Sequence, residues 1–268
     1  MSTPIPSKPL KGWRILVPRG GPWGDSVAAD LRARGATPVV APMINFAPTE
    51  DPERLTSALA ALAAGAFDWL TVTSATTVDV MYSQGVTIPD RTRVAAVGET
   101  TAAALQAVGY RVDLVPAKDN SAKGMLSELT QLEPKPKRFL TLRSEIAKPL
   151  LTEGLVRAGH NVESVVAYRT IGEPVSPKII EDVRSGRING ILVTSGSVAQ
   201  QVVEQFGALP ESTLVAAIGP RTAKDASGFG LTIHVVSRHQ TVSALLDSMV
   251  VLVESGDAPQ SLDTATSD

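Results

Sequence analysis

The chain has 268 residues, of which 43% are hydrophobic and 19% charged, and its formal net charge is −2. This length predicts two domains with substantial cores, and the balanced charge argues against a nucleic-acid partner, which needs a clustered basic face. Cysteine is absent, which excludes disulfides, thiolate catalysis and cysteine-based metal sites.

The two ends of the chain give no sign of a membrane partner. Residues 1–10 are polar and rich in proline, without the apolar core of a signal peptide. No apolar run approaches the roughly 20 residues of a membrane span. We therefore expect a cytoplasmic protein. Residues 256–268 are small, polar and acidic, and we expect a disordered tail there, or a linker to something further.

The first predicted strand is R-I-L-V-P-R at 14–19, and a helical stretch ending at Arg34-Gly35 follows it. A short apolar run, a turn and an Ala/Leu/Val-rich stretch are typical of a buried parallel strand with its crossover helix. Segment 37–50 comes next and is extended and punctuated by proline. We interpret it as a long strand or a linker.

Two phrases then appear that recur later in the chain. The first is L-T-V-T-S-A-T-T-V at 70–78, repeated as I-L-V-T-S-G-S-V-A at 191–199. The second is V-A-A-V-G-E-T-T-A-A-A-L at 94–105, repeated as V-A-A-I-G-P-R-T-A-K-D-A at 215–226. In both copies the serine of the first phrase precedes the glycine of the second by 24 positions. Two copies that match in both sequence and spacing indicate a duplicated α/β unit.

The first strand also has a copy, R-F-L-T-L-R at 138–143, followed by an extended segment at 162–174. The two extended segments occupy equivalent places and favour an interleaved chain order over a tandem division near residue 135. We expect an α/β fold of two similar, flavodoxin-like parallel-sheet domains joined by a two-stranded linker. The expected boundaries are 1–43 with 172–255 for a discontinuous first domain, and 44–171 for the second.

Clusters of Ser, Thr and Gly follow four of the predicted strands, where ligands bind in parallel α/β sheets. Each cluster is expected to begin a helix, and helix N-termini bind carboxylates or phosphates through unpaired N–H groups. Taken singly, such turns are also ordinary helix caps. The clusters are Thr73-Ser74, Gly98–Thr101, Thr194–Ser197 and Gly219–Thr222.

Familiar catalytic and cofactor motifs are missing. The glycines at 19–24 have the wrong spacing for a dinucleotide-binding turn, and no phosphate-binding P-loop sequence occurs. His160, His234 and His239 lack metal-ligand spacing. We therefore expect neither a metal nor a cofactor, and a site that works by shape and positioning.

Taken together, these features resemble the uroporphyrinogen-III synthase family over about residues 13–253. The resemblance rests on a combination of short phrases, each of them weak alone. They are V-T-S at 72–74, V-G-E-T-T-A at 97–102, V-A-Y-R-T at 166–170, V-T-S-G-S at 193–197 and I-G-P-R-T-A at 218–223.

The resemblance implies two α/β domains with an active site in the cleft between them, and a cofactor-free lyase. The implied substrate is hydroxymethylbilane, a linear tetrapyrrole with eight carboxylates. Its ring A hydroxyl is lost to give an azafulvene, ring D attacks through its substituted carbon to form a spiro intermediate, and reclosure yields uroporphyrinogen III with ring D inverted. Without an enzyme the substrate closes to the wrong isomer.

The resemblance also assigns residues. Tyr168 corresponds to a linker tyrosine proposed to donate a proton to the departing hydroxyl, and Arg19 and Arg143, at equivalent strand ends, are candidates for pairing with acetate or propionate groups. Glu99 departs from this pattern because a carboxylate there would repel a polyanion. The positions expected to bind substrate carboxylates are Thr73, Ser74, Thr101, Ser195, Ser197 and Thr222.

Other functions remain open at this stage. The same two-domain body is compatible with a non-catalytic sensor of a tetrapyrrole or another anion, attached to a DNA-binding domain beyond the acidic tail. A sugar- or phosphate-binding protein fits the Y-x-T and I-G-P-x-T-A phrases less well. For the synthase we expect a monomer whose partners are hydroxymethylbilane and, transiently, hydroxymethylbilane synthase.

Overall fold

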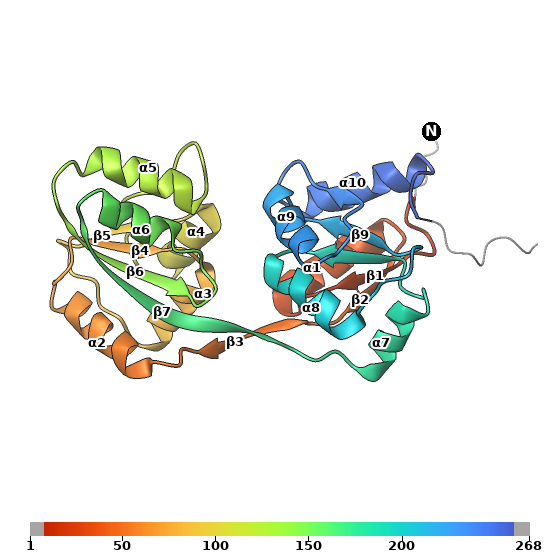
Figure 1. Ribbon diagram of the computed structural model, residues 1–268, viewed down its shortest axis with the longest axis horizontal. Coiled ribbons are helices and arrows are strands. Elements are labelled where there is room, and N and C mark those ends of the chain that lie inside the picture. The colour runs from red at the N-terminus through yellow and green to blue at the C-terminus, as the bar shows by residue number, and fades with distance from the viewer. Residues whose placement is uncertain (1–7, 260–268) are drawn as a thin grey trace, which may run out of the picture. The chain divides into compact units, whose positions relative to one another are not determined.

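The computed structural model describes residues 8–259 (Figure 1). The chain divides into two compact units, and each contains one five-stranded sheet. Unit 1 comprises the chain up to Asn45 and from Ile171 onward, and unit 2 is Phe46–Thr170. Residues 1–7 and most of the expected tail, 260–268, lie outside the described residues.

Unit 1 has the strand order β10-β9-β8-β1-β2, with every pair parallel. Its strands are β1 (Arg14–Val17), β2 (Thr37–Val40), β8 (Gly190–Val193), β9 (Leu214–Ala217) and β10 (Val235–Val236). Its helices are α1 (Gly21–Ala33), α7 (Pro177–Arg184), α8 (Gly196–Phe206), α9 (Pro220–Gly228) and α10 (Val242–Glu254).

Helices cover both faces of the unit 1 sheet, because successive strand residues are apolar and point to opposite faces. Leu16 and Ile191 pack with side chains of α7, α8 and α9, whereas Ile15 and Leu192 pack with α1 and α10. All four strand side chains are fully buried. This two-sided burial explains the uninterrupted apolar runs in the sequence.

Unit 2 repeats this plan with the strand order β3-β7-β6-β4-β5. Its strands are β3 (Ile44–Pro48), β4 (Trp69–Val72), β5 (Arg93–Ala96), β6 (Arg138–Ser144) and β7 (Asn161–Gly172). Its helices are α2 (Pro52–Ala63), α3 (Ala75–Ser83), α4 (Glu99–Ala107), α5 (Ala122–Leu132) and α6 (Leu150–Arg157). Leu70 and Leu140 pack with α2, α3 and α4, and Trp69 and Phe139 pack with α5 and α6.

The predicted fold and its interleaved order are confirmed. In unit 1 the N-terminal strand β1 pairs with β8, from the second copy of the repeat, and in unit 2 β6 pairs with β4, from the first copy. The order β9-β8-β1-β2 therefore matches β5-β4-β6-β7. The duplicated halves of the sequence exchange their first strands in space.

The two extended segments form the connections between the units. Segment 162–174 is a single strand over most of its length, since β7 runs from Asn161 to Gly172. Segment 37–50 is not one long strand: it breaks between β2 and β3 at residues 41–43. Pro42 lies at the break, and proline has no N–H to continue a ladder. Of the two interpretations given from the sequence, a long strand describes segment 162–174, and an interrupted linker describes segment 37–50.

Within residues 8–259, no helix combines the length and the apolarity that crossing a bilayer requires.

Gly24 in α1 lets the first turn of the helix pack against the loop that follows β1. A Cβ atom there would lie 2.3 Å from the backbone oxygen of Arg19. We expect Gly24→Ala to lower the free energy of unfolding by about 1–3 kcal/mol, because the backbone must shift to relieve the overlap. Urea unfolding followed by circular dichroism measures this loss.

Gly228 in α9 is the matched control. A Cβ atom there would meet nothing within 4 Å, and its φ is not positive. Gly228→Ala is expected to leave stability unchanged or to raise it by up to about 1 kcal/mol through helix propensity. Equal losses for the two variants would contradict the role of the close approach.

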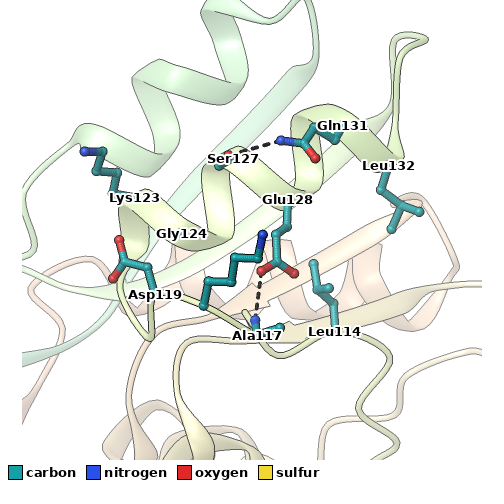
Figure 2. Close-up of a pocket in the computed structure, with 10 residues that line it drawn as sticks. Leu114, Ala117, Asp119, Lys123, Gly124, Ser127, Glu128, Gln131 and Leu132 are labelled. Carbon is teal, nitrogen blue, oxygen red and sulfur yellow. Dashed lines mark hydrogen bonds between the residues drawn. The ribbon is translucent and has the colours of Figure 1, made fainter.

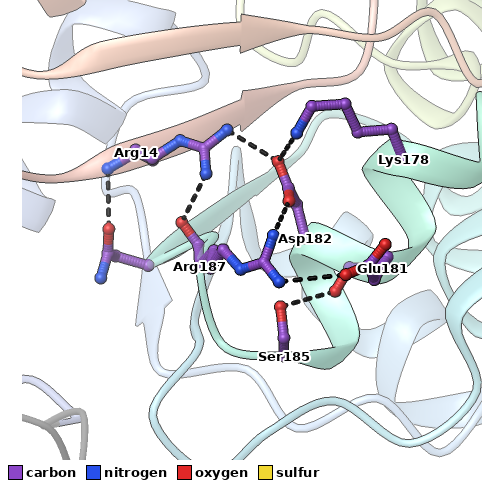
Figure 3. Close-up of polar contacts among 7 residues, drawn as sticks. Arg14, Lys178, Glu181, Asp182, Ser185 and Arg187 are labelled. Atoms are coloured by element: carbon purple, nitrogen blue, oxygen red, sulfur yellow. Dashed lines mark hydrogen bonds and ion pairs between the residues drawn. The ribbon is translucent and has the colours of Figure 1, made fainter.

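A buried carboxylate joins three cations at the amino-terminal end of the unit 1 sheet (Figure 3). Asp182, whose side chain is 3% exposed, contacts Arg14 at 2.9 Å, Lys178 at 3.1 Å and Arg187 at 2.9 Å. Arg14 begins β1, Lys178 and Asp182 belong to α7, and Arg187 precedes β8. The network thus ties α7 to two neighbouring strands, on the edge of the sheet opposite the Ser/Thr turns.

Candidate active site

The four Ser/Thr/Gly turns lie at the carboxyl ends of parallel strands, and each begins a helix, as predicted. Ser74 follows β4 and caps α3, accepting the N–H of Thr77 at 3.2 Å. Ser195 follows β8 and caps α8, accepting the N–H of Val198 at 3.2 Å. The duplicated phrase therefore produces the same cap in both units.

Glycines cap the other two helices in different ways. Gly98, before α4, has φ 81°, a conformation that favours glycine, whereas Gly219, before α9, is extended at φ −177°. Pro220 occupies the first turn of α9, as expected from its fixed φ. The N–H groups of the first turn have no partner within the helix and carry a partial positive charge. All four turns therefore offer donors suited to anions.

Tyr168 lies on β7 in unit 2, at the end of the sheet where the turn after β4 begins α3. Its side chain is 7% exposed, and its hydroxyl donates to Ser74 Oγ at 3.0 Å. The ring meets Phe46 edge-on, with centroids 5.3 Å apart and an interplanar angle of 86°. The predicted donor and one predicted carboxylate-binding residue are thus directly hydrogen-bonded.

Thr77 extends this contact into a chain of hydroxyls. Ser74 Oγ accepts from Tyr168 and from the Thr77 N–H, so its own proton is available for Thr77 Oγ1, 3.0 Å away. Thr77 is fully buried. Sequence reasoning did not single out Thr77, although its place three residues after a capping serine is a recognisable signal. The second copy has Val198 there, so the chain of hydroxyls exists in unit 2 alone.

The other threonines predicted in unit 2 differ in exposure. Thr73 is partly exposed, beside the cap of α3, whereas Thr101 is only 4% exposed. Thr101 is the third residue of α4, so its backbone N–H is one of the unpaired first-turn donors. Any contact of Thr101 with an anion is therefore expected through the backbone rather than the hydroxyl.

Arg143 lies near the carboxyl end of β6 and is held by its own unit. Its Nε donates to Ser164 Oγ at 3.0 Å, and its Nη1 donates to the backbone oxygens of Ser144 and Glu145 at 2.9 and 3.1 Å. These bonds orient the guanidinium and occupy several of its donors. The pairing of Arg143 with a substrate carboxylate stays a prediction, and it requires the guanidinium N–H groups that these bonds leave available.

The unit 1 candidates lie after three neighbouring strands. Arg19 follows β1, Ser195 and Ser197 follow β8, and Thr222 follows β9. Arg19 is exposed, and its guanidinium lies 5.1 Å from the Trp23 ring centre. It forms no ion pair with any residue between 8 and 259. Ser195, Ser197 and Thr222 are partly exposed.

Thr194, next to the cap of α8, is a further polar residue of this group. Its Oγ1 is buried and has no hydrogen-bond partner among the described residues. A buried hydroxyl left unpaired costs about 1–3 kcal/mol. The predicted turn 194–197 contained this residue, but sequence alone gave no reason to separate it from its neighbours.

Two of the three histidines, His160 and His234, take structural roles. Burial lowers the pKa of both His160 and His234, which favours the neutral ring. The Nδ1 atoms accept backbone N–H groups, from Lys137 at 3.2 Å and from Val215 at 3.0 Å. A ring nitrogen that accepts carries no proton, so these side chains hold loop backbone in place.

A cavity of about 750 Å³ lies along α5 in unit 2, away from Tyr168 (Figure 2). Lys118 and Lys123 line it together with Asp119 and Glu128, so its charges are of both signs. Glu128 accepts the N–H of Ala117 at 2.8 Å and thereby holds the loop before the helix. We assign no catalytic part to this cavity.

With this geometry in place, comparison with known proteins decides the family. The family model described as uroporphyrinogen-III synthase HemD matches residues 25–247, most of the chain. The chain belongs to the uroporphyrinogen-III synthase (HemD) family. The resemblance drawn from the short phrases is thereby confirmed.

Two curated relatives of this family span nearly the whole chain. The porphyrin biosynthesis protein HemD of Ruminiclostridium josui is 27% identical over an alignment of 255 residues, which covers 91% of this chain and 49% of that protein. The chain thus spans about half the length of that relative. The uroporphyrinogen-III synthase of Synechococcus elongatus is 27% identical over 262 residues, covering 89% of this chain and 95% of that one.

Solved structures of family members share the fold. A mutant uroporphyrinogen III synthase from Thermus thermophilus aligns with a TM-score of 0.64 at 19% identity, covering 91% of this chain and 99% of that one. The uroporphyrinogen-III synthetase of Helicobacter pylori aligns with a TM-score of 0.61 at 18% identity, covering 90% and 99%. At such identities the likeness supports the two-domain α/β architecture of the family alone.

Proposed function

We propose that this chain is an active uroporphyrinogen-III synthase, a lyase that cyclises hydroxymethylbilane with inversion of ring D. Family membership gives the reaction class, and the hydrogen bond from Tyr168 to Ser74 carries the proposal for this chain. This hydrogen bond supports the proposal because it holds a phenolic hydroxyl beside a helix N-terminus, at the edge of the sheet where parallel α/β units bind ligands.

In the proposed first step Tyr168 donates its proton to the departing hydroxyl of ring A. The resulting phenolate needs a donor, and Ser74, 3.0 Å away, supplies one when its hydroxyl proton turns from Thr77 toward the phenolic oxygen. The positive end of α3 stabilises the same negative charge. The chain of hydroxyls thus lowers the cost of transferring the proton.

The helix N-termini are proposed to hold the substrate by its acetate and propionate groups. Unit 2 supplies the first turns of α3 and α4, with Thr73, Ser74 and Thr101. Unit 1 supplies those of α8 and α9, with Ser195, Ser197 and Thr222. Backbone N–H groups bind carboxylates without becoming acids or bases. Such a site suits a reaction in which folding the substrate correctly matters more than strong acid–base chemistry.

An isomer assay tests the proposed function. Hydroxymethylbilane is generated in situ by its synthase, this protein is added, and isomers III and I are separated after oxidation by liquid chromatography. We expect isomer III to dominate, against isomer I in the control without protein. An isomer ratio equal to that control would reject the enzyme and would favour the sensor alternative instead.

We further propose that the protein acts as a monomer in the cytoplasm and receives its unstable substrate from hydroxymethylbilane synthase in a transient encounter. Each of the two similar units in one chain already carries two helix N-termini proposed to bind anions, so the proposal does not need a second copy of the chain. Light scattering coupled to size-exclusion chromatography is expected to give one 268-residue chain per particle.

A further inference from the structure

A cavity of about 470 Å³ lies within unit 2 beside Tyr168. It is enclosed by α2, α3, β3 and β7. Helix α3 contributes residues spaced three, four and seven apart, which share one helix face. These residues are Thr76, Asp79, Val80 and Ser83.

Part of the wall of this cavity is apolar and suited to a flat ring. Phe46, Pro48 and Pro52 line it together with Leu55 and the backbone around Ala167. Phe46 is 42% exposed although its ring packs against that of Tyr168. An aromatic ring and prolines offer planar faces on which another ring can stack.

Asp79 is the single carboxylate among the lining residues. It is exposed and forms no hydrogen bond or ion pair with the part of the chain that the structure describes. Of the lining hydroxyls, Ser83 donates to Val80 O at 2.8 Å and Thr56 donates to Pro52 O at 2.9 Å. Asp79 is the one charged acceptor in this lining, which suits it to the N–H group of a ligand.

We propose that this cavity receives the pyrrole ring that carries the hydroxymethyl group, and that Asp79 accepts the N–H of that ring. The inference rests on the proposed function and names the subsite that positions the reacting ring. Tyr168 and Asp79 both line this cavity, so a single ring bound there can contact both side chains.

The placement gives Asp79 a catalytic role in the first step. Tyr168 transfers its proton to the hydroxyl oxygen, the C–O bond breaks with its electron pair on that oxygen, and water leaves. The methylene carbon becomes electron-deficient, and the positive charge spreads onto the pyrrole nitrogen. The carboxylate of Asp79, hydrogen-bonded to the N–H, stabilises that positive charge as it develops. The phenolate left on Tyr168 carries the negative charge that the proton transfer creates.

Fragment binding tests the subsite without turnover. Pyrrole and 1-methylpyrrole are titrated into the ¹⁵N-labelled full chain, and amide shifts of cavity residues are followed by NMR. We expect pyrrole to shift them and 1-methylpyrrole, which has no N–H, to bind at least about fivefold more weakly. Asp79→Ala is expected to remove this preference. Equal binding of the two fragments to the wild type, or shifts elsewhere only, would overturn the inference.

Turnover measurements test the role of the negative charge of Asp79. Asp79→Asn keeps an acceptor but loses the negative charge, so we expect kcat for isomer III to fall roughly 10- to 100-fold with pyrrole binding retained. Asp90→Asn, an exposed carboxylate in the loop before β5, is the control and is expected to keep full activity. Thr56→Trp, which fills the cavity from an exposed helix position, is expected to lose both fragment binding and turnover.

The outcomes distinguish the role of Asp79 from the proposed synthase function. Wild-type formation of isomer III together with a fully active Asp79→Asn variant overturns the role of Asp79 and leaves the synthase intact. Absence of isomer III with the wild type rejects the synthase, and the catalytic role of Asp79 with it. A wild type that forms isomer III, binds pyrrole in the cavity and loses rate in Asp79→Asn supports both.

Discussion

Tyr168→Phe is expected to lower kcat for isomer III about 100- to 1,000-fold while changing KM by less than about threefold. The phenylalanine keeps the ring that packs on Phe46 but removes the proton that the departing hydroxyl needs. Because the hydroxyl is used in the chemical step, the loss falls on turnover and not on binding of substrate or product. Initial rates with an excess of freshly made hydroxymethylbilane measure both constants.

Tyr82→Phe is the matched control. Tyr82 belongs to the same unit, on α3, and is 64% exposed, so its variant is expected to keep wild-type rates. Unchanged kcat in Tyr168→Phe would mean that the phenolic hydroxyl is not the donor. A raised KM with unchanged kcat would instead assign Tyr168 to substrate binding.

Asp182→Asn is expected to lower the Tm of unit 1 by roughly 5–10 °C. The substitution leaves three cationic side chains around a buried group that no longer carries a charge, and it turns an amide N–H₂ toward donors (Figure 3). Removing one partner of a buried ion network is strongly destabilising, because the remaining charges stay in place without compensation. Differential scanning calorimetry follows the transition.

Ionisation of the Asp182 carboxyl makes the Tm difference between wild type and Asp182→Asn depend on pH. Hydrogen bonds from Arg14 and Lys178 hold the pKa of the Asp182 carboxyl below its ordinary value. A lowered folded-state pKa contributes stability that is fully present above the ordinary carboxyl pKa, near 4, and that is lost as the pH falls through the folded value. The Tm gap between wild type and Asp182→Asn is therefore expected to be constant from about pH 7 to 5 and to narrow below about pH 4.

Glu181→Gln provides the control for this experiment. Glu181 pairs with Arg187 at 3.0 Å, but both side chains are largely exposed, so its loss is expected to shift Tm by less than about 2 °C. A gap for Asp182→Asn that stays the same down to about pH 3 would contradict the assignment of the stabilisation to the ionised carboxylate. Equal effects of the two variants would show that burial of Asp182 is not what matters.

Much of the fold was predictable because its determinants are local. Four- to six-residue apolar runs, capping serines and glycines, and the repeated 24-residue spacing are written along the chain, and each corresponds to one strand–turn–helix step. The sequence left segment 37–50 open between a long strand and a linker. The structure breaks it at residues 41–43, where Pro42 has no N–H to continue the ladder, despite its extended, β-branched neighbours.

The candidate site was predictable to a smaller degree. The phrases located Ser74, Ser195 and Tyr168, because cap positions and the family pattern depend on short stretches. The contact between Tyr168 and Ser74 joins residues 94 positions apart and depends on the pairing of β6 with both β4 and β7. No local pattern specifies such a pairing.

By itself the sequence determined the elements, the duplication and the helix N-termini that can bind anions, since these follow from side-chain periodicity and capping within a few residues. The tertiary structure alone decided that Thr101 is buried while Thr73 is partly exposed, that Thr77 completes a chain of hydroxyls, and that Asp79 shares a cavity with Tyr168. These outcomes depend on which face of each helix packs against its sheet. That choice is made when apolar surface from distant segments is buried together.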